Sequence, residues 1–309
     1  IMLVGHSNPD VVKAGQAAMA RLNTNTRYLY PELNNYADKL LQKFPPSLDK
    51  VYFVNSGSAA TDLALRLARS YTTRKKIMVL EEGYHGNTQA AIEISHYKYS
   101  KAGSIGKPDH VVESKLPNAF ALEANMRINA ASYFSNRAKE LIADHSGTLG
   151  AFIAEPIVGC GGQVPLPIGY LNEVYDALRR QGGICISDEV QVGFGRLGNS
   201  YWGFEIQGVI PDIVILGQPM GNGHPLGAVV TTTEIAEKFA EGPEFFTSFG
   251  GNPVSCLIGE EVLNVIERDS LQHHAKQVGD YFKEQRKILQ ESYDSIGDIR
   301  GEGLFLGVE

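Results

Sequence analysis

An acidic pair closes one of the apolar runs in this sequence. In GICISDE (183–189), Asp188 and Glu189 follow apolar residues that predict a short buried strand. Open α/β sheets bind ligands outside the carboxyl ends of their strands, so both carboxylates are candidates for a binding site. A buried carboxylate requires a cationic partner, which indicates a positively charged group nearby.

A Ser/Gly turn follows another expected strand, in NSGSAATDLALRL (55–67), and a helix begins there. In one interpretation the free N–H groups and the helix dipole around Gly57 and Ser58 bind an anion. In the other, Ser56 or Ser58 is an ordinary N-cap. The residue pattern alone leaves both interpretations open.

Two further stretches carry side chains that suit a ligand. Tyr84 and His85 follow the strand expected at 77–80, where an aromatic ring can stack on a flat cofactor or simply pack in the core. In FFTSFGGNP (245–253), Thr247 and Ser248 offer hydroxyl groups beside a glycine turn. The alternative for this stretch is a tight turn before a helix that has Pro253 at its first position.

Two glycine-rich segments look alike but differ in context. GFGRLG (193–198) matches the dinucleotide-binding pattern G-x-G-x-x-G, yet no helix is expected to open inside it, so the match is interpreted as coincidental. LGQPMGNGHP (216–225) has the form of a buried strand that ends in a glycine-rich loop, with Gln218 at its third position. Histidines and cysteines show no metal-ligand spacing, so no metal site is expected.

The elements that must position these residues alternate along the chain. Short apolar runs predict buried strands, and amphipathic stretches between them predict helices, which together indicate an α/β fold with a mainly parallel sheet and helices on both faces. The predicted strands are 50–54, 77–80, 150–156, 183–189, 212–216 and 226–232, and the predicted helices are 58–71, 132–145 and 170–182. We expect an N-terminal segment (1–44), a large domain (45–252) and the start of a smaller α+β domain (253–309).

Composition narrows the class of protein. The chain has 309 residues and a formal net charge of −7, which argues against a nucleic-acid or membrane-surface role. Three separated cysteines and the absence of a signal peptide or a long apolar run favour a cytoplasmic location. Because the sequence begins at Ile1 and stops at Glu309 after an apolar run, we expect a fragment of a longer protein.

The order and spacing of the motifs carry more information than any one of them. NSGSAATDLALRLAR, YHGNT, AEPIVGCGG, SDEVQVGFGRLG, PDIVILGQPMGNGHPLGAVV, SFGGNP and IGDIRGEGLFLGVE together resemble the class III aminotransferase family. Its members are fold-type-I enzymes that use pyridoxal 5′-phosphate (PLP). LNTNTRYLY (22–30), CGGQVPLPIGYL (160–171) and GNGHP look most similar to the ethanolamine-phosphate phospholyase branch and its bacterial aminotransferase relatives.

The resemblance implies a role for each candidate residue. Gly57 and Ser58 would hold the cofactor phosphate, and Tyr84 and Val190 would cover the two faces of its ring. His85 would also be a cofactor-binding residue. Asp188 would pair with the pyridinium nitrogen and so keep the ring electron-accepting. Gln191 would reach the ring hydroxyl, and Glu155 would position the substrate or Asp188. Ser248 would reach the cofactor phosphate of a neighbouring subunit, which implies a homodimer with shared active sites.

The family's Schiff-base lysine aligns with Gln218. A carboxamide is neither a nucleophile nor a base, so this residue can neither bind the cofactor covalently nor move a proton. His224 could act as a base there, or it is a structural residue of the loop. Gln218 is explained either by an engineered change that stops the reaction or by a natural relative with altered or lost activity.

Four functions are compatible with these observations, and we give them from the most to the least favoured. The first is transfer of an amino group from a small primary amine or amino acid to a keto acid, with this chain inactive or trapped because of Gln218. The second is elimination of phosphate from a phosphorylated amino-alcohol, for which Arg27 is the candidate cation, although it can equally be a surface or subunit-interface charge. The third is non-catalytic PLP binding, and the last is a nicotinamide dehydrogenase.

Overall fold

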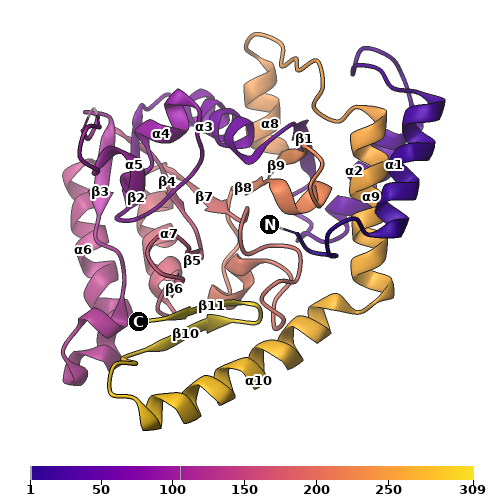
Figure 1. Cartoon of the computed structure of the whole chain (residues 1–309). Coiled ribbons are helices and arrows are strands. Elements are labelled where there is room, and N and C mark those ends of the chain that lie inside the picture. Colours follow the sequence, from indigo (N-terminus) through magenta and orange to yellow (C-terminus); the bar gives the residue numbers. More distant parts are fainter. Residues whose placement is uncertain (1, 105) are drawn as a thin grey trace.

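The computed structural model describes residues 2–104 and 106–309, and a seven-stranded sheet forms its centre (Figure 1). The strand order is β1-β9-β8-β7-β4-β2-β3, and β9 alone runs antiparallel to its neighbours in this sheet. The strands are β1 (Lys50–Val54), β2 (Lys76–Leu80), β3 (Val111–Ser114), β4 (Leu149–Ala154), β7 (Ile184–Asp188), β8 (Ile213–Leu216) and β9 (Gly227–Thr231). The predicted α/β fold with a mainly parallel sheet is confirmed. The prediction missed β3, whose short sequence VVES gives little apolar signal.

Helices cover both faces of this sheet, because successive side chains of a strand point to opposite sides. In β2, Ile77 and Val79 join one buried cluster, whereas Met78 and Leu80 join another. The first cluster contains side chains of α3 (Gly57–Thr72) and α8 (Thr233–Ala240), and the second those of α6 (Ala130–Asp144) and α7 (Tyr170–Arg180). Two short helices, α4 (Gln89–Glu93) and α5 (His96–Tyr99), follow β2.

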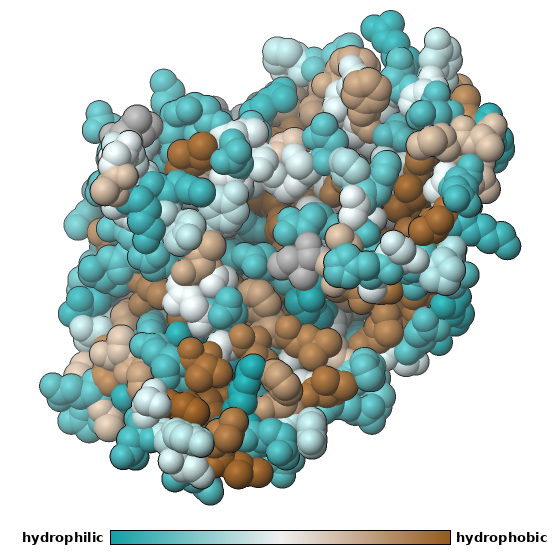
Figure 2. Space-filling view, in the orientation of Figure 1, coloured by the Kyte–Doolittle hydropathy of each residue, from teal (hydrophilic) through white to brown (hydrophobic). Residues whose placement is uncertain are grey.

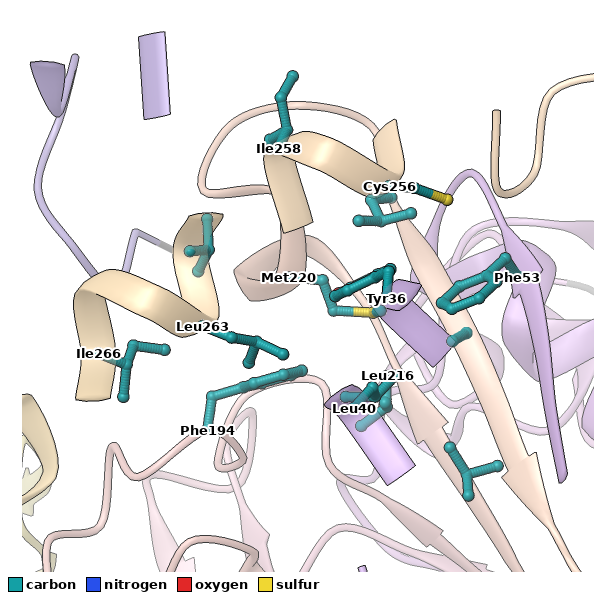
Figure 3. Close-up of a cluster of buried hydrophobic side chains, with 14 of the residues drawn as sticks. Tyr36, Leu40, Phe53, Phe194, Leu216, Met220, Cys256, Ile258, Leu263 and Ile266 are labelled. Atoms are coloured by element: carbon teal, nitrogen blue, oxygen red, sulfur yellow. The ribbon is translucent and has the colours of Figure 1, made fainter. Parts of the chain in front are cut away.

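A third cluster joins the N-terminal segment to the sheet. It contains side chains of α1 (Pro9–Arg21), α2 (Pro31–Leu41) and α9 (Pro253–Arg268), and Figure 3 shows part of it. Tyr36 stacks on Phe53 of β1 with ring centroids 5.1 Å apart, and the fully buried Met220 of η4 (Gln218–Gly221) points into the same cluster. Since α9 shares this core with β8 and β9, the domain boundary at residue 253 stays a prediction.

The last part of the chain is a long helix and a hairpin along one edge of the molecule (Figure 1). The helix α10 (Leu271–Ser292) precedes the antiparallel pair β10 (Ile299–Glu302) and β11 (Phe305–Val308). Arg300 ties β10 to the rest of the fold, because its Nε donates to the Gly162 carbonyl at 2.9 Å. Figure 2 shows hydrophobic side chains along this edge, where exposed residues include Phe282, Ile288, Leu289 and Leu304.

The remaining elements are short. They are the two-stranded pair β5 (Ile157–Val158) and β6 (Val164–Pro165), and the 3₁₀ turns η1 (Ala119–Ala121), η2 (Ala124–Asn129) and η3 (Gly203–Gln207). Among the helices formed by residues 2–104 and 106–309, none is both long enough and apolar enough to cross a membrane.

Candidate active site

A cavity of about 550 Å³ lies where the loops after five strands meet. Its walls come from the segments that follow β1, β2, β4, β7 and β8, as the rule for ligand sites in open α/β sheets requires. Nine of the predicted site residues line it, namely Gly57, Ser58, Tyr84, His85, Glu155, Asp188, Val190, Gln191 and Gln218. Residues far apart in the sequence are therefore assembled at one place.

The start of α3 forms one wall of the cavity. Ser56 is the N-cap, since its Oγ accepts a hydrogen bond from the Ala59 amide at 3.1 Å, so the N-cap interpretation is correct for this residue. Gly57 and Ser58 occupy the first turn and line the cavity, with the positive end of the helix dipole facing it. This wall suits an anionic group.

Asp188 contributes a buried carboxylate to the lining of the same cavity. Its Oδ2 is 2.7 Å from His85 Nδ1, and its Oδ1 accepts a hydrogen bond from the Val190 amide at 3.1 Å. Asp188 and His85 are exposed by only 4% and 3%, so water screens the pair poorly. His85 is itself held by its backbone, whose carbonyl accepts from Thr61 Oγ1 at 2.6 Å and whose amide donates to Ser95 Oγ at 2.9 Å.

Glu155 connects several residues of the cavity wall. Its Oε1 accepts from the Tyr84 amide, and its Oε2 accepts from the Gly159 amide and from Gln191 Nε2, each at 3.2 Å. Burial, reinforced by the nearby charge of Asp188, raises the pKa of Glu155 to about 7. Glu155 therefore positions Tyr84 and Gln191, and it can hold a proton near neutral pH.

Glu189 does not belong to the cavity, which corrects the expectation for the acidic pair. Its Oε2 accepts from the Gly203 amide at 2.7 Å, and its Oε1 accepts from the Phe204 amide at 2.9 Å and from Ser187 Oγ at 3.0 Å. Burial raises its pKa to about 7. This carboxylate organises the start of η3 and leaves Asp188 as the acidic group of the pair that faces a ligand.

Two glycines make room for Val190 between the strand ends. A Cβ on Gly57 would lie 3.2 Å from Val190 Cγ2, and a Cβ on Gly217 would lie 2.9 Å from Val190 Cγ1. The Val190 side chain is therefore fixed against the backbone of both turns.

Gln218 follows Gly217 directly in the sequence, and it is exposed at the start of η4 and on the cavity wall. Among the described residues that line this cavity, none is a lysine or an arginine.

Arg27 and Ser248 lie outside this cavity, on one exposed edge. Their segments contact each other, because the Thr26 amide donates to the Ser248 carbonyl at 3.2 Å and the Arg27 guanidinium lies 5.6 Å from the centre of the Phe246 ring. Both residues are exposed. Within one chain, neither reaches the group of residues around Asp188.

The model of one protein family, described as aminotransferase class III, matches residues 1–309. The chain belongs to this family. It is 48% identical to the alanine–glyoxylate aminotransferase 2-like protein of Drosophila melanogaster, over 99% of the chain and 64% of that protein. It is 38% identical to the ethanolamine-phosphate phospho-lyase homolog 1 of Caenorhabditis elegans, over 99% of the chain and 68% of that protein. The chain thus spans about two thirds of these relatives.

Solved structures of other proteins share this fold. A phospholyase from Arthrobacter, in complex with phosphoethanolamine, superposes with a TM-score of 0.93 and 36% identity over 99% of this chain and 73% of that one. An (S)-enantioselective omega-transaminase from Thermomicrobium roseum gives a TM-score of 0.92 and 30% identity over 99% and 71% of the two chains. These similarities confirm the fold-type-I architecture, and GFGRLG (193–198) forms turns with no helix, as expected for a coincidental match.

This class III aminotransferase chain also has cavity residues that the motifs did not reveal. Of these, Met2 lies outside every quoted motif, whereas the others lie inside the motifs but were given no role in the site, namely Asn55, Cys160, Gly223, Pro225 and Leu226. His224 was considered only as a loop residue or a base. Met2 reaches the cavity because the side chain of Asn222 accepts hydrogen bonds from the Leu3 and Val4 amides at 2.8 and 3.1 Å. Asn222 adopts a left-handed backbone conformation, and the sequence signal that could have marked this turn is the Asn-Gly pair at 222–223.

A group of three possible metal ligands lies elsewhere, at Glu81, His96 and Glu113, whose ligand atoms are within 4.8 Å of one another. His96 Nδ1 accepts a hydrogen bond from the Glu82 amide at 2.9 Å, so the proton of a neutral ring is on Nε2. Nε2 is the nitrogen that faces Glu113, 3.9 Å away. Metal binding there would require both nitrogens to be unprotonated, so the geometry argues against it.

Proposed function

We propose that this chain carries the PLP site of a class III aminotransferase that acts on a small primary amine or amino acid and a keto acid. The observation that supports this most is the polarity of the cavity. An anion-binding helix start at Gly57 and Ser58 and a buried carboxylate at Asp188 line one space that is flanked by Tyr84 and Val190. A flat ring with a phosphate at one end and a protonated nitrogen at the other has this distribution of charge.

The residues present fit such a cofactor without a covalent bond. Asp188 would hold the proton of the ring nitrogen, and its carboxylate is already oriented by His85 and the Val190 amide. Gln191, held by Glu155, would reach a ring substituent. PLP, when bound, supplies an electron-accepting ring, and the protein groups named here fix its orientation and protonation.

Gln218 determines what this chain does with the cofactor. A lysine at this position would supply an amine that bonds to the cofactor and moves the substrate proton, and a carboxamide does neither. We therefore propose that the chain retains PLP through non-covalent contacts and turns over poorly or not at all. An engineered change and a natural loss of the lysine both remain compatible with this proposal.

Phosphate elimination from a phosphorylated amino-alcohol is the second candidate. Similarity to the Arthrobacter phospholyase favours it. A phosphorylated substrate requires cations, and the described lining of the cavity contains no lysine or arginine. Arg27 could contribute only from another subunit, because in its own chain it lies on the exposed edge. A non-catalytic PLP-binding protein is the third candidate, supported by Gln218.

We also propose that the protein forms a homodimer and is located in the cytoplasm. The edge that carries Arg27 and Ser248 also exposes large apolar side chains, at Tyr28, Leu29, Phe246 and Phe249. A second copy that covered this edge would remove these side chains from water. The cytoplasmic location rests only on the sequence features described above.

The experiment is a PLP-binding titration of the unmodified chain and of Asp188→Asn. Loss of a charge-assisted contact should weaken binding at least about tenfold. Asp176→Asn, at an exposed position on α7, is the matched control and should bind as the unmodified chain does. Equal affinity of all three proteins, or no binding by the unmodified chain, would refute the proposed site.

Gln218→Lys then separates the candidate reactions. With an amine and a keto acid it should transfer the amino group if the first proposal holds. With phosphoethanolamine it should release phosphate if the second holds. A variant that binds PLP covalently but does neither would favour the non-catalytic alternative for these substrates.

A further inference from the structure

His224 stands on the cavity wall, six residues after Gln218, and belongs to a hydrogen-bonded chain that the active-site residues do not use. Its Cβ lies close to the turn at Gly221, where an added Cβ would be 3.3 Å from it. The His224 Nε2 is 2.8 Å from the Oγ of Ser255, a buried residue in the first turn of α9. This contact joins the loop after η4 to α9.

Asn252, the N-cap of α9, decides the direction of that hydrogen bond. The Asn252 Oδ1 accepts from the Ser255 amide at 3.0 Å, so the other atom of the carboxamide is the NH₂ group. This NH₂ group donates to the Phe249 carbonyl at 2.7 Å and to Ser255 Oγ at 2.8 Å. Ser255 Oγ therefore accepts from Asn252 and still has its own hydrogen to donate.

Among the described residues, the hydroxyl hydrogen of Ser255 has one acceptor. Ser255 is 1% exposed, and a buried hydroxyl group needs an acceptor for its hydrogen. Among the hydrogen bonds of the described residues, His224 Nε2 is the partner of Ser255 Oγ that can accept, since the Asn252 NH₂ group cannot. His224 Nε2 is thus unprotonated, and the proton of the neutral ring is on Nδ1.

The environment also keeps this ring neutral. Burial lowers the pKa of His224. A second proton on Nε2 would point at Ser255 Oγ and leave the hydroxyl hydrogen without its acceptor. Within residues 2–104 and 106–309, no hydrogen bond of the Nδ1 group is present, so this N–H is available to a ligand.

We propose that His224 is a fixed hydrogen-bond donor for an anionic oxygen of the substrate, a carboxylate or a phosphate, and not a base that replaces the missing lysine. The inference rests on the proposed function of the same cavity and specifies its substrate class. The other ionisable side chains that line the cavity include two carboxyl groups, Glu155 and Asp188, and the described lining has no lysine or arginine. A neutral N–H donor is therefore one of the few groups there that favour a negatively charged substrate oxygen.

The ring protonation is measured first, on the chain without cofactor. Nitrogen-15 NMR of histidine-labelled protein, with the His224 signals assigned by their loss in His224→Phe, should show a protonated Nδ1 and an unprotonated Nε2 at pH 7.5. Ser255→Ala should raise the population with the proton on Nε2. A wild-type ring protonated on Nε2, or one that Ser255→Ala leaves unchanged, overturns the proposal even if PLP binding fails.

Ligand binding to the PLP-loaded chain tests the donor itself. Phosphoethanolamine, β-alanine and ethanolamine are titrated against the unmodified chain, His224→Phe and His224→Asn, with the cofactor spectrum as the signal. His224→Phe should weaken one or both anionic ligands about tenfold or more and leave ethanolamine within about twofold. His224→Asn, which keeps a donor, should recover part of the loss.

The ligand that binds more weakly to His224→Phe identifies the anionic group that His224 contacts. A loss for phosphoethanolamine alone indicates a phosphate, and a loss for β-alanine alone indicates a carboxylate. An equal loss for all three ligands, or no loss for any of them, overturns the proposal. If PLP itself does not bind, the proposed function fails, while the NMR result still decides the state of His224.

Discussion

Replacing Glu155 with glutamine should change how the stability of the chain without cofactor depends on pH. Burial beside Asp188 raises the pKa of Glu155 from 4.5 to about 7, so between these values the folded state binds about one more proton than the unfolded chain. The free energy of unfolding therefore falls as pH rises through this range, by on the order of 1 kcal/mol per pH unit, which is the linkage of about one proton. Glu155→Gln should remove this contribution to the slope of the unfolding free energy against pH. Any loss of stability that the new amide causes is independent of pH and leaves the slope unchanged.

The assay is urea unfolding at several values between pH 5 and pH 8. Glu189→Gln is the matched control, because burial also raises the pKa of Glu189 to about 7 but its hydrogen bonds go to η3. In both variants, the slope of the unfolding free energy against pH should lose the contribution of one proton. PLP binding should also change near pH 7, because Glu155 lines the cavity and gains its negative charge there. Glu155→Gln should remove this change and Glu189→Gln should keep it, since Glu189 is not among the lining residues. An unchanged slope in Glu155→Gln, or loss of the change in PLP binding in Glu189→Gln, would refute the reasoning.

Two further predictions concern the turns that shape the cavity. Gly86→Ala should lower the melting temperature clearly more than Gly147→Ala, because a Cβ on Gly86 would lie 2.8 Å from Ser58 Oγ, whereas one on Gly147 would meet nothing within 4 Å. Equal losses would show that the positive φ values of both glycines, and not the contact with Ser58, set the cost. Met220→Ala should cost about 2–5 kcal/mol in urea unfolding because the side chain is fully buried. Met220→Leu should cost less than about 1.5 kcal/mol, and similar losses for both variants would contradict the assigned packing.

The sequence predicted the parts of this molecule that depend on local pattern. Six apolar runs became strands of the central sheet, since a strand covered on both faces reads as a continuous apolar stretch. Residues directly after those strands had to meet at one edge, which is why Asp188, Tyr84 and Gly57 could each be named as a candidate. The resemblance to a family added their roles.

The prediction failed where the outcome depends on tertiary contacts. Adjacent residues of an extended segment point to opposite sides, so Asp188 and Glu189 could not both face the ligand, although the strand pattern alone made both candidates. The resemblance favoured Asp188, and the structure shows what Glu189 does instead. Met2 reaches the cavity through a contact with Asn222, more than two hundred residues later in the chain. The state of His224 depends on Ser255, which no periodicity connects to it.

The central claim is that Gln218 occupies the position from which a lysine amine would bond to PLP. The direct test is Gln218→Lys, incubated with PLP, reduced with borohydride and examined by intact and peptide mass spectrometry beside the unmodified chain. The account predicts one covalently attached cofactor, on the peptide that contains residue 218, in the variant and none in the unmodified chain. Attachment to another lysine in the unmodified chain, or a variant that retains PLP through dialysis without becoming labelled, would contradict it.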